Sequence, residues 1–133
     1  MSELSEPWFA YDFAVLRLVP QVHRGEYHNI GVILYAPTSK FLAGRFLEEE
    51  QSLESCALRH DIDLQMVTRY LQVLGMIIRG DADGGPIARL PLSERFHWLS
   101  APRSDILQPG ALHPGRCRNI EACVDELFAQ FVL

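Results

Sequence analysis

The chain has 133 residues, 48% of them hydrophobic and 22% charged, with a formal net charge of −5. This size and composition predict one folded domain over residues 1–133, of which 1–10 form a loose N-terminal segment, and exclude a disordered or fibrous protein. An acidic chain has the wrong sign for a protein that binds nucleic acid over its whole surface, so we expect no nucleic-acid partner. No apolar run reaches the roughly 18 residues of a membrane span.

The N-terminal sequence and the cysteines indicate the compartment. MSELSEPW lacks the basic and apolar segments of a secretory signal, which predicts a cytoplasmic protein. Cys56, Cys117 and Cys123 form no CxxC pair, so we expect free thiols in a reducing compartment.

The first half of the chain has the pattern of β-strands. Residues 11–19 are apolar on both alternating faces, which is typical of a central strand covered on both sides. Residues 30–35 form a second such run and 41–47 a third, which predicts an antiparallel meander. Gly31 indicates a bulge or another segment passing close to the second strand. A short fourth strand is expected at 105–108.

From Asp61 onward the apolar spacing becomes helical. One main helix is predicted near 62–79, with Asp61 or Asp63 as its N-cap and Gly80 at its C-terminal end. A second main helix is predicted near 120–132. Strands first and helices mostly after predict an α+β fold, in which an antiparallel sheet has the two helices packed against it.

Two weaker helical segments accompany these elements. Residues 50–59 are interpreted as a shorter helix. Ser93 is placed to cap one helical turn through Trp98, which Pro102 would end.

The connection between the first two strands, residues 20–29, is long and polar. On a rigid hairpin such a loop is a good place for a binding site. Arg24 would then fork onto a carboxylate or phosphate, Glu26 would orient it or act as a base, and Asn29 would fix a turn. Alternatively, Arg24 pairs with Glu26, Asn29 caps the next strand, and the loop satisfies itself.

Arg17 interrupts the first apolar strand. A charge within a sheet needs a partner, and Asp12 and Glu26 are the candidates that the sequence offers.

A second polar cluster contains Arg95, Trp98, Arg103 and Ser104. Interleaved Arg and aromatic side chains are suited to stacking on a ring and gripping an anion. The alternative is that Trp98 closes the core with Phe96 while the arginines stay in solvent.

A third cluster surrounds His113. Together with His97 and Cys117 it lacks the paired spacing of dependable zinc motifs, so no metal is expected. His113 is suited to hydrogen bonding or proton transfer near neutral pH, and a structural bond is the alternative. The phosphate-binding, dinucleotide-binding and hydrolase motifs are absent, so no cofactor is expected.

Three blocks of the sequence, FAVLRLVPQVHRGEYHNIGVILYAP, GPIARLPLSERFHWLSAPRS and LHPG, resemble the bacterial family catalogued as domain of unknown function 3037. The family pattern maps onto Arg24, Gly25, Glu26, Asn29, Gly31, Val32, Arg95, Phe96, Trp98, Arg103, Ser104, His113 and Gly115. Where related chains commonly have Ser and Pro before the last His, this chain has Gly110, Ala111 and Leu112. The resemblance implies no reaction and no cofactor. Members are often encoded beside a HipA-like kinase homologue, so it does imply a protein partner of that kind.

Besides a nucleic-acid-binding module that uses the basic segment 86–118, which the net charge disfavours, two functions remain open. The leading hypothesis is a cytoplasmic accessory or binding module for a partner protein, whose contact surface combines residues 20–29, 95–104 and 113. The alternative is a small metal-independent phosphodiesterase or nucleotide-handling enzyme. It requires four side chains to converge. Arg24 and Arg103 would hold the phosphate, with Glu26 and His113 as base and acid.

Overall fold

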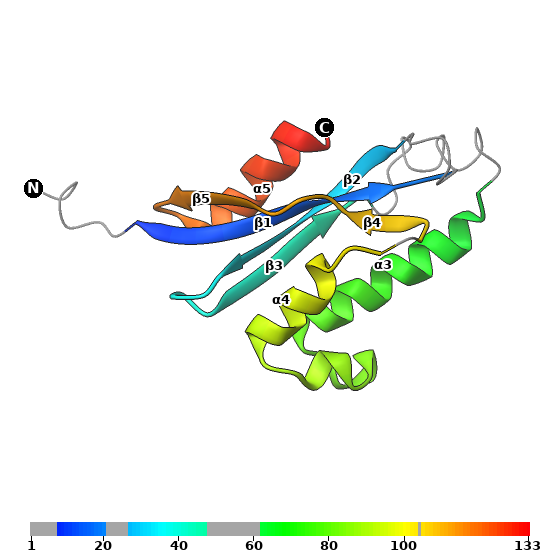
Figure 1. The fold of residues 1–133 in the computed structure, drawn as a ribbon, viewed down its shortest axis with the longest axis horizontal. Coiled ribbons are helices and arrows are strands. Elements are labelled where there is room, and N and C mark those ends of the chain that lie inside the picture. The colour runs from blue at the N-terminus through cyan, green and yellow to red at the C-terminus, as the bar shows by residue number, and fades with distance from the viewer. Residues whose placement is uncertain (1–7, 21–26, 48–61, 104) are drawn as a thin grey trace, which may run out of the picture.

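The computed structural model describes residues 8–20, 27–47, 62–103 and 105–133. In these ranges it contains an antiparallel sheet with helices, the α+β fold that the sequence predicts (Figure 1). The elements, in chain order, are β1 (Phe9–Leu18), β2 (His28–Ala36), β3 (Phe41–Phe46), α3 (Leu64–Arg79), the 3-10 turns η2 (Ala82–Gly84) and η3 (Ile87–Arg89), α4 (Leu92–Ser100), β4 (Leu107–Pro109), β5 (His113–Cys117) and α5 (Ile120–Phe131).

β1 is the central strand of the sheet. The strand order is β3-β2-β1-β4, and β5 also pairs with β1. β4 pairs with the end of β1 at Leu16 to Leu18, whereas β5 pairs with its beginning, from Phe9 to Phe13. One edge of β1 is therefore covered by β2 and the other by β4 and β5 in succession, so β1 is the central strand that its apolar pattern predicts.

The two faces of the sheet are covered by different helices. Tyr35 on β2 packs on Phe96 of α4, and Phe13 on β1 packs on Phe131 of α5. Because Phe13 is paired with Leu34, the neighbour of Tyr35, these contacts lie on opposite faces. α3 and α4 therefore cover one face and α5 covers the other (Figure 1).

α3 has both of the end signals that the sequence predicts. Asp63 is the N-cap, and its carboxylate accepts hydrogen bonds from the backbone N–H groups of Gln65 and Met66. Gly80 ends the helix at φ 69°, a left-handed conformation that glycine adopts at little cost. One stripe of the helix is buried against the sheet and consists of Val67, Leu71, Leu74, Ile77 and Ile78.

α4 is longer than the single turn that the sequence suggests. It runs from Leu92 to Ser100 and begins after Pro91, with no side-chain cap, so the capping role given to Ser93 is wrong. Pro91 has a fixed φ and starts the helix without needing a backbone donor. The expected helix at 50–59 lies outside the described residues.

The strand predictions differ at two ends of the sheet. β1 begins at Phe9, inside the segment expected to be loose, because Phe9 and Ala10 pair with β5. β5 itself was not predicted, since HPGRC carries two strand-breaking residue types. Pro114 is tolerated because β5 lies at an edge of the sheet. The fourth strand is confirmed in position but runs from Leu107 to Pro109.

Gly31 has the role that its place in a strand suggests. The ring of Phe46 lies against it, so that a Cβ there would clash with Phe46 Cδ1. A β-bulge interrupts the neighbouring register between Leu16 and Arg17. Within the described residues, no helix has the length and apolarity needed to cross a membrane.

Candidate functional site

Seven residues were predicted to form a binding site. Arg24, Glu26 and Ser104 lie outside the described residues, so their part in a site stays a prediction. The other four, Asn29, Arg95, Arg103 and His113, are described, and they occupy different parts of the fold.

Asn29 joins β2 to the end of α5. Its Nδ2 donates a hydrogen bond to the backbone carbonyl of Phe131 at 3.0 Å. Its Oδ1 is buried and has no partner in the described part of the chain. Asn29 thus holds the helix to the sheet with one half of its amide and leaves the other half unused.

Arg95, a residue of α4, reaches the C-terminal end of α3. Its Nη1 donates to the carbonyls of Ile77 and Ile78 at 2.9 and 3.2 Å. These carbonyls are among those that a helix end leaves without intrahelical donors. A cation there also interacts favourably with the helix dipole. Arg95 is therefore a capping side chain, and the expectation that the arginines of this cluster stay in solvent is wrong for it.

Arg103 does the same at the end of α4 and adds a link to α3. Its Nη2 donates to the carbonyls of Trp98 and Leu99 at 3.0 and 2.8 Å, and its Nη1 donates to the hydroxyl of Tyr70 at 3.1 Å. The Tyr70 hydroxyl in turn donates to Asp105 at 3.3 Å. The guanidinium also lies 4.8 Å from the centre of the Trp98 ring. Its hydrogen bonds tie two helices together.

His113 lies on the other face of the sheet. It is exposed, and its ring packs on Phe13 at 5.4 Å between centres. Phe13 packs on Phe131 of α5, whereas Arg103 is bonded to α3 and α4. The structure therefore does not bring Arg103 and His113 together, because the sheet separates them.

An apolar groove lies between α3 and α4, with a volume of about 350 Å³. Three of its large side chains are exposed, Met66 by 43%, Val73 by 44% and Trp98 by 37%. The full lining consists of Met66, Arg69, Tyr70, Val73, Leu74 and Trp98. We call this surface the α3–α4 groove. Exposed apolar side chains gathered in this way are characteristic of interaction sites.

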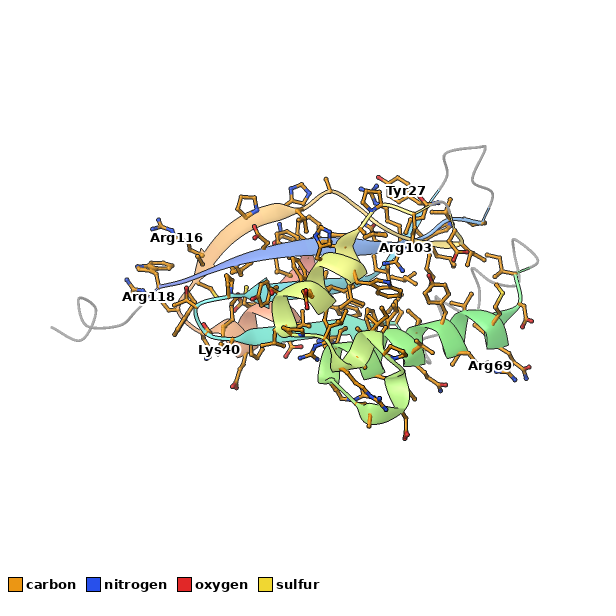
Figure 2. The ribbon with its side chains drawn as sticks, turned by 60° about the horizontal axis from the view of Figure 1, so that its bottom comes forward. Tyr27, Lys40, Arg69, Arg103, Arg116 and Arg118 are labelled. Atoms are coloured by element: carbon orange, nitrogen blue, oxygen red, sulfur yellow. The ribbon has the colours of Figure 1, made fainter. Side chains whose placement is uncertain are left out.

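Two arginines border the α3–α4 groove. Arg69 is exposed and points outward from α3 (Figure 2). It has no ion-pair partner among the residues that the structure describes. Arg103 lies over Trp98 at the opposite wall. The Tyr70 hydroxyl joins Arg103 to one acidic group, Asp105. The rim therefore offers positive charge beside an apolar floor, although the chain as a whole is acidic.

The sequence contains a signal for this groove, but the stronger pattern of the buried stripe on α3 obscures it. Met66, Tyr70 and Val73 recur at helical spacing on α3, but they are off the stripe that faces the sheet. Extra apolar residues beside a complete core stripe indicate a second contact surface. Only the position of α4 shows that Trp98 completes it.

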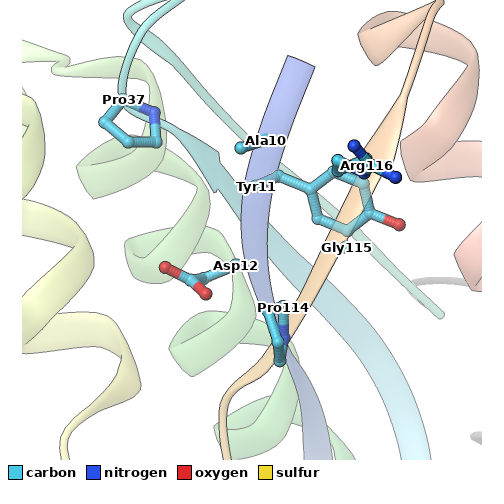
Figure 3. A pocket seen from close by; sticks show the side chains of 7 residues that line it. All are labelled: Ala10, Tyr11, Asp12, Pro37, Pro114, Gly115 and Arg116. Carbon is cyan, nitrogen blue, oxygen red and sulfur yellow. The ribbon is translucent and has the colours of Figure 1, made fainter. Parts of the chain in front are cut away.

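A second hollow of about 410 Å³ lies where β5 meets β1 (Figure 3). The ring of Tyr11 covers Gly115, while Asp12 points to the other face of β1. Burial raises the pKa of the Tyr11 hydroxyl above its ordinary value, helped by the neighbouring Cys123 thiol. Burial and Cys123 also raise the pKa of the Cys117 thiol to about 11. Both groups therefore stay protonated at neutral pH, which makes them poor nucleophiles.

The described residues contain no group of three or more His, Cys, Asp or Glu side chains arranged to hold a metal ion. Lys40, Arg116 and Arg118 lie at the opposite end of the molecule from Arg69 and Arg103 (Figure 2). The cations at that far end do not border the α3–α4 groove.

Comparison with protein families gives one match. The model of the family described as Protein of unknown function (DUF3037) matches residues 13–132, nearly the whole chain, so the chain belongs to this family. The family that the sequence blocks resemble is confirmed. Comparisons with the curated proteins and with the solved structures found no match.

Proposed function

We propose that this member of the DUF3037 family is a binding or accessory module that docks a partner protein in the α3–α4 groove. The observation that carries the proposal is the cluster of exposed apolar side chains in that groove, among them Val73, which is 44% exposed. Aromatic residues, Met and Arg are enriched at protein interfaces, and the groove combines all three.

The groove suggests what kind of segment would dock. Helices often bind in apolar grooves through residues spaced three or four apart, because these lie on one face. Arg69 and Arg103 at the rim would favour acidic residues beside such apolar anchors. An acidic amphipathic helix is therefore the chemistry that fits this surface.

For the partner itself, we propose a HipA-like kinase homologue in the cytoplasm, as the family resemblance implies. The surface differs from the one expected from the sequence in two respects. His113 lies on the opposite face of the sheet and is not part of the groove. Arg95 and Arg103 donate to helix-end carbonyls, so Trp98, Met66 and Val73 supply most of the contact area. Residues 20–29 keep their proposed part in partner binding.

The enzymatic alternative receives less support. It requires Arg24, Glu26, Arg103 and His113 to reach one substrate, but Arg103 and His113 lie on opposite faces of the sheet. General acid and base must both come within hydrogen-bond reach of the reacting atoms. We therefore do not propose a phosphodiesterase or nucleotide-handling activity.

The test is binding to a HipA-like kinase homologue. The two purified proteins should co-elute in size-exclusion chromatography, and Val73→Asp should weaken the affinity about tenfold or more in calorimetry, because it places a carboxylate in the groove. Leu112→Asp is the matched control, since Leu112 is an exposed hydrophobic residue outside the groove. The absence of any complex would refute this partner. A complex that Val73→Asp and Leu112→Asp affect equally would refute the groove.

A further inference from the structure

Arg17 occupies an unusual place for an arginine. It lies on the central strand β1, paired with Asn29 on β2 and with Gln108 on β4. Its side chain is half-buried, and its Nε is buried without a hydrogen-bond partner in the described residues. Asp12, one of the two acids considered for it, lies on the opposite face of β1, because five positions separate the two residues. Glu26, the other, lies outside the described residues.

Two contacts hold the Arg17 guanidinium in place without bonding to it. Its Cζ lies 4.2 Å from the centre of the Tyr27 ring, a cation–π distance. The backbone at Gly110 comes so close that a Cβ there would lie 3.0 Å from the same Cζ. Neither contact supplies a hydrogen-bond acceptor, so the two contacts position the fork of donors without satisfying it.

Arg45 gives an internal comparison on the same face of the sheet. Its guanidinium also lies over an aromatic ring, Phe128, at 4.4 Å. Arg45 has an acid partner, however, because its Nη1 donates to Asp125 at 3.0 Å. Arg17 has the ring but no acid in the described part of the chain. The position that a carboxylate takes beside Arg45 is thus not filled beside Arg17.

Asn29 adds an acceptor next to these donors. Because Nδ2 donates to the Phe131 carbonyl, which can only accept, the orientation of the amide is fixed. The remaining Oδ1 is buried and has no partner in the described ranges. An unsatisfied buried acceptor costs free energy, and a bound group with an N–H would remove that cost.

We propose that Arg17, Tyr27 and Asn29 form a binding site for a carboxylate that carries a neighbouring N–H, as at the C-terminus of a peptide or in a free amino acid. The carboxylate would take both donors of the Arg17 fork. The N–H would donate to Asn29 Oδ1. Tyr27, which is 49% exposed, would pack against one side of the ligand. Phosphate fits less well, because HPO4²⁻ has no N–H and only one O–H, and its other oxygens are acceptors like Asn29 Oδ1. The proposal does not rest on partner binding in the α3–α4 groove.

Calorimetric titration with N-acetyl-glycyl-alanine tests the site. We expect saturable binding, with a Kd of about 1 mM or below for so small a ligand. Its C-terminal amide should bind at least about tenfold more weakly, since it lacks the charge for Arg17. Inorganic phosphate should show no binding. Free alanine separates the two sources of the carboxylate: tighter binding of the dipeptide indicates a peptide terminus, and tighter binding of alanine indicates an amino acid.

Variants assign the binding to these residues. Arg17→Met should reduce the affinity about tenfold or more, and Arg17→Lys by a similar factor, because Lys has no planar fork. Tyr27→Leu, an exposed change that leaves the fold intact, should reduce it about threefold. Arg45→Met is the matched control, since it removes one positive charge from the same face and should leave the affinity unchanged. Equal affinity in wild type and Arg17→Met, or no heat with any carboxylate, would overturn the proposal.

Discussion

Arg17, on the α5 face of this sheet, is held differently from the two hydrogen-bonded arginines on the α3 and α4 face. On the α3 and α4 face, Arg95 and Arg103 donate to the carbonyls at helix ends. On the α5 face, Arg17 is held by the Tyr27 ring and by Gly110, and its Nε has no partner in the described residues. A bonded arginine stabilises a fold, whereas an arginine without an acceptor is stabilised only when a ligand arrives. Substitution of each arginine tests this difference through the free energy of unfolding.

The largest loss of stability is expected for Arg103→Met. The variant removes the donors that serve Trp98, Leu99 and Tyr70, and it leaves the two carbonyls at the end of α4 short of partners. Charged hydrogen bonds contribute about 1.5–3 kcal/mol, so we expect a loss of about 3 kcal/mol in the free energy of unfolding. Urea denaturation measures it. A loss below about 1 kcal/mol would mean that water replaces the guanidinium at little cost.

Arg95→Met should cost somewhat less, about 2 kcal/mol, since one Nη serves both carbonyls at the end of α3. Thermal unfolding is a suitable measurement, with Arg89→Met as the control because Arg89 is exposed. If Arg95→Met and Arg89→Met both unfold at the same temperature as the wild type, the capping role of Arg95 is refuted.

Gly80→Ala tests the same helix end from the backbone side. Gly80 has φ 69°, and a Cβ there would lie 2.8 Å from Arg95 Nη1. Left-handed strain and displacement of the arginine together predict a loss of about 1–2 kcal/mol. In the Arg95→Met background the cost of Gly80→Ala should be smaller, because the close contact is gone. A double-mutant cycle measures the difference, and strict additivity would contradict the coupling.

Cys117 gives a prediction for pH. Its pKa is raised from 9.0 to about 11, so the folded state holds the proton more tightly than the unfolded state does. The stabilisation is fully present below pH 9 and is lost as the pH rises from 9 toward 11. We expect the urea midpoint to fall over that window and to fall less in Cys117→Ala. A midpoint that rises or stays level would contradict the raised pKa.

Alternation and helical spacing predict most of this fold. The apolar runs of β1 and β2, the Asp63 cap and the Gly80 end of α3 follow from local physical chemistry. β5 does not, because Pro114 and Gly115 argue against a strand and only pairing with β1 overrides them. Local preference predicts elements well where it agrees with the tertiary pairing, and fails where the pairing decides.

The site was less predictable, since it depends on which face each segment occupies. Arg103 and His113 are ten positions apart in sequence, yet the chain between them runs along the edge of the sheet, and they end on opposite faces. The sequence marks Arg17 as a charge in need of a partner. Asp12 is excluded as that partner only because side chains alternate between the two faces of β1. The groove at Val73 needed the position of α4 to become visible.

The central claim is that Arg17 is kept for a ligand and not for the fold, so its removal should have the smallest effect on stability. Replacing a half-buried charge that has no acid partner among the described residues by an apolar side chain is close to neutral. The lost contact with Tyr27 is worth less than about 1 kcal/mol. The direct measurement is urea denaturation of Arg17→Met beside Arg103→Met. The account predicts that Arg17→Met stays within about 0.5 kcal/mol of wild type while Arg103→Met loses about 3 kcal/mol. Equal losses in the two variants would contradict it.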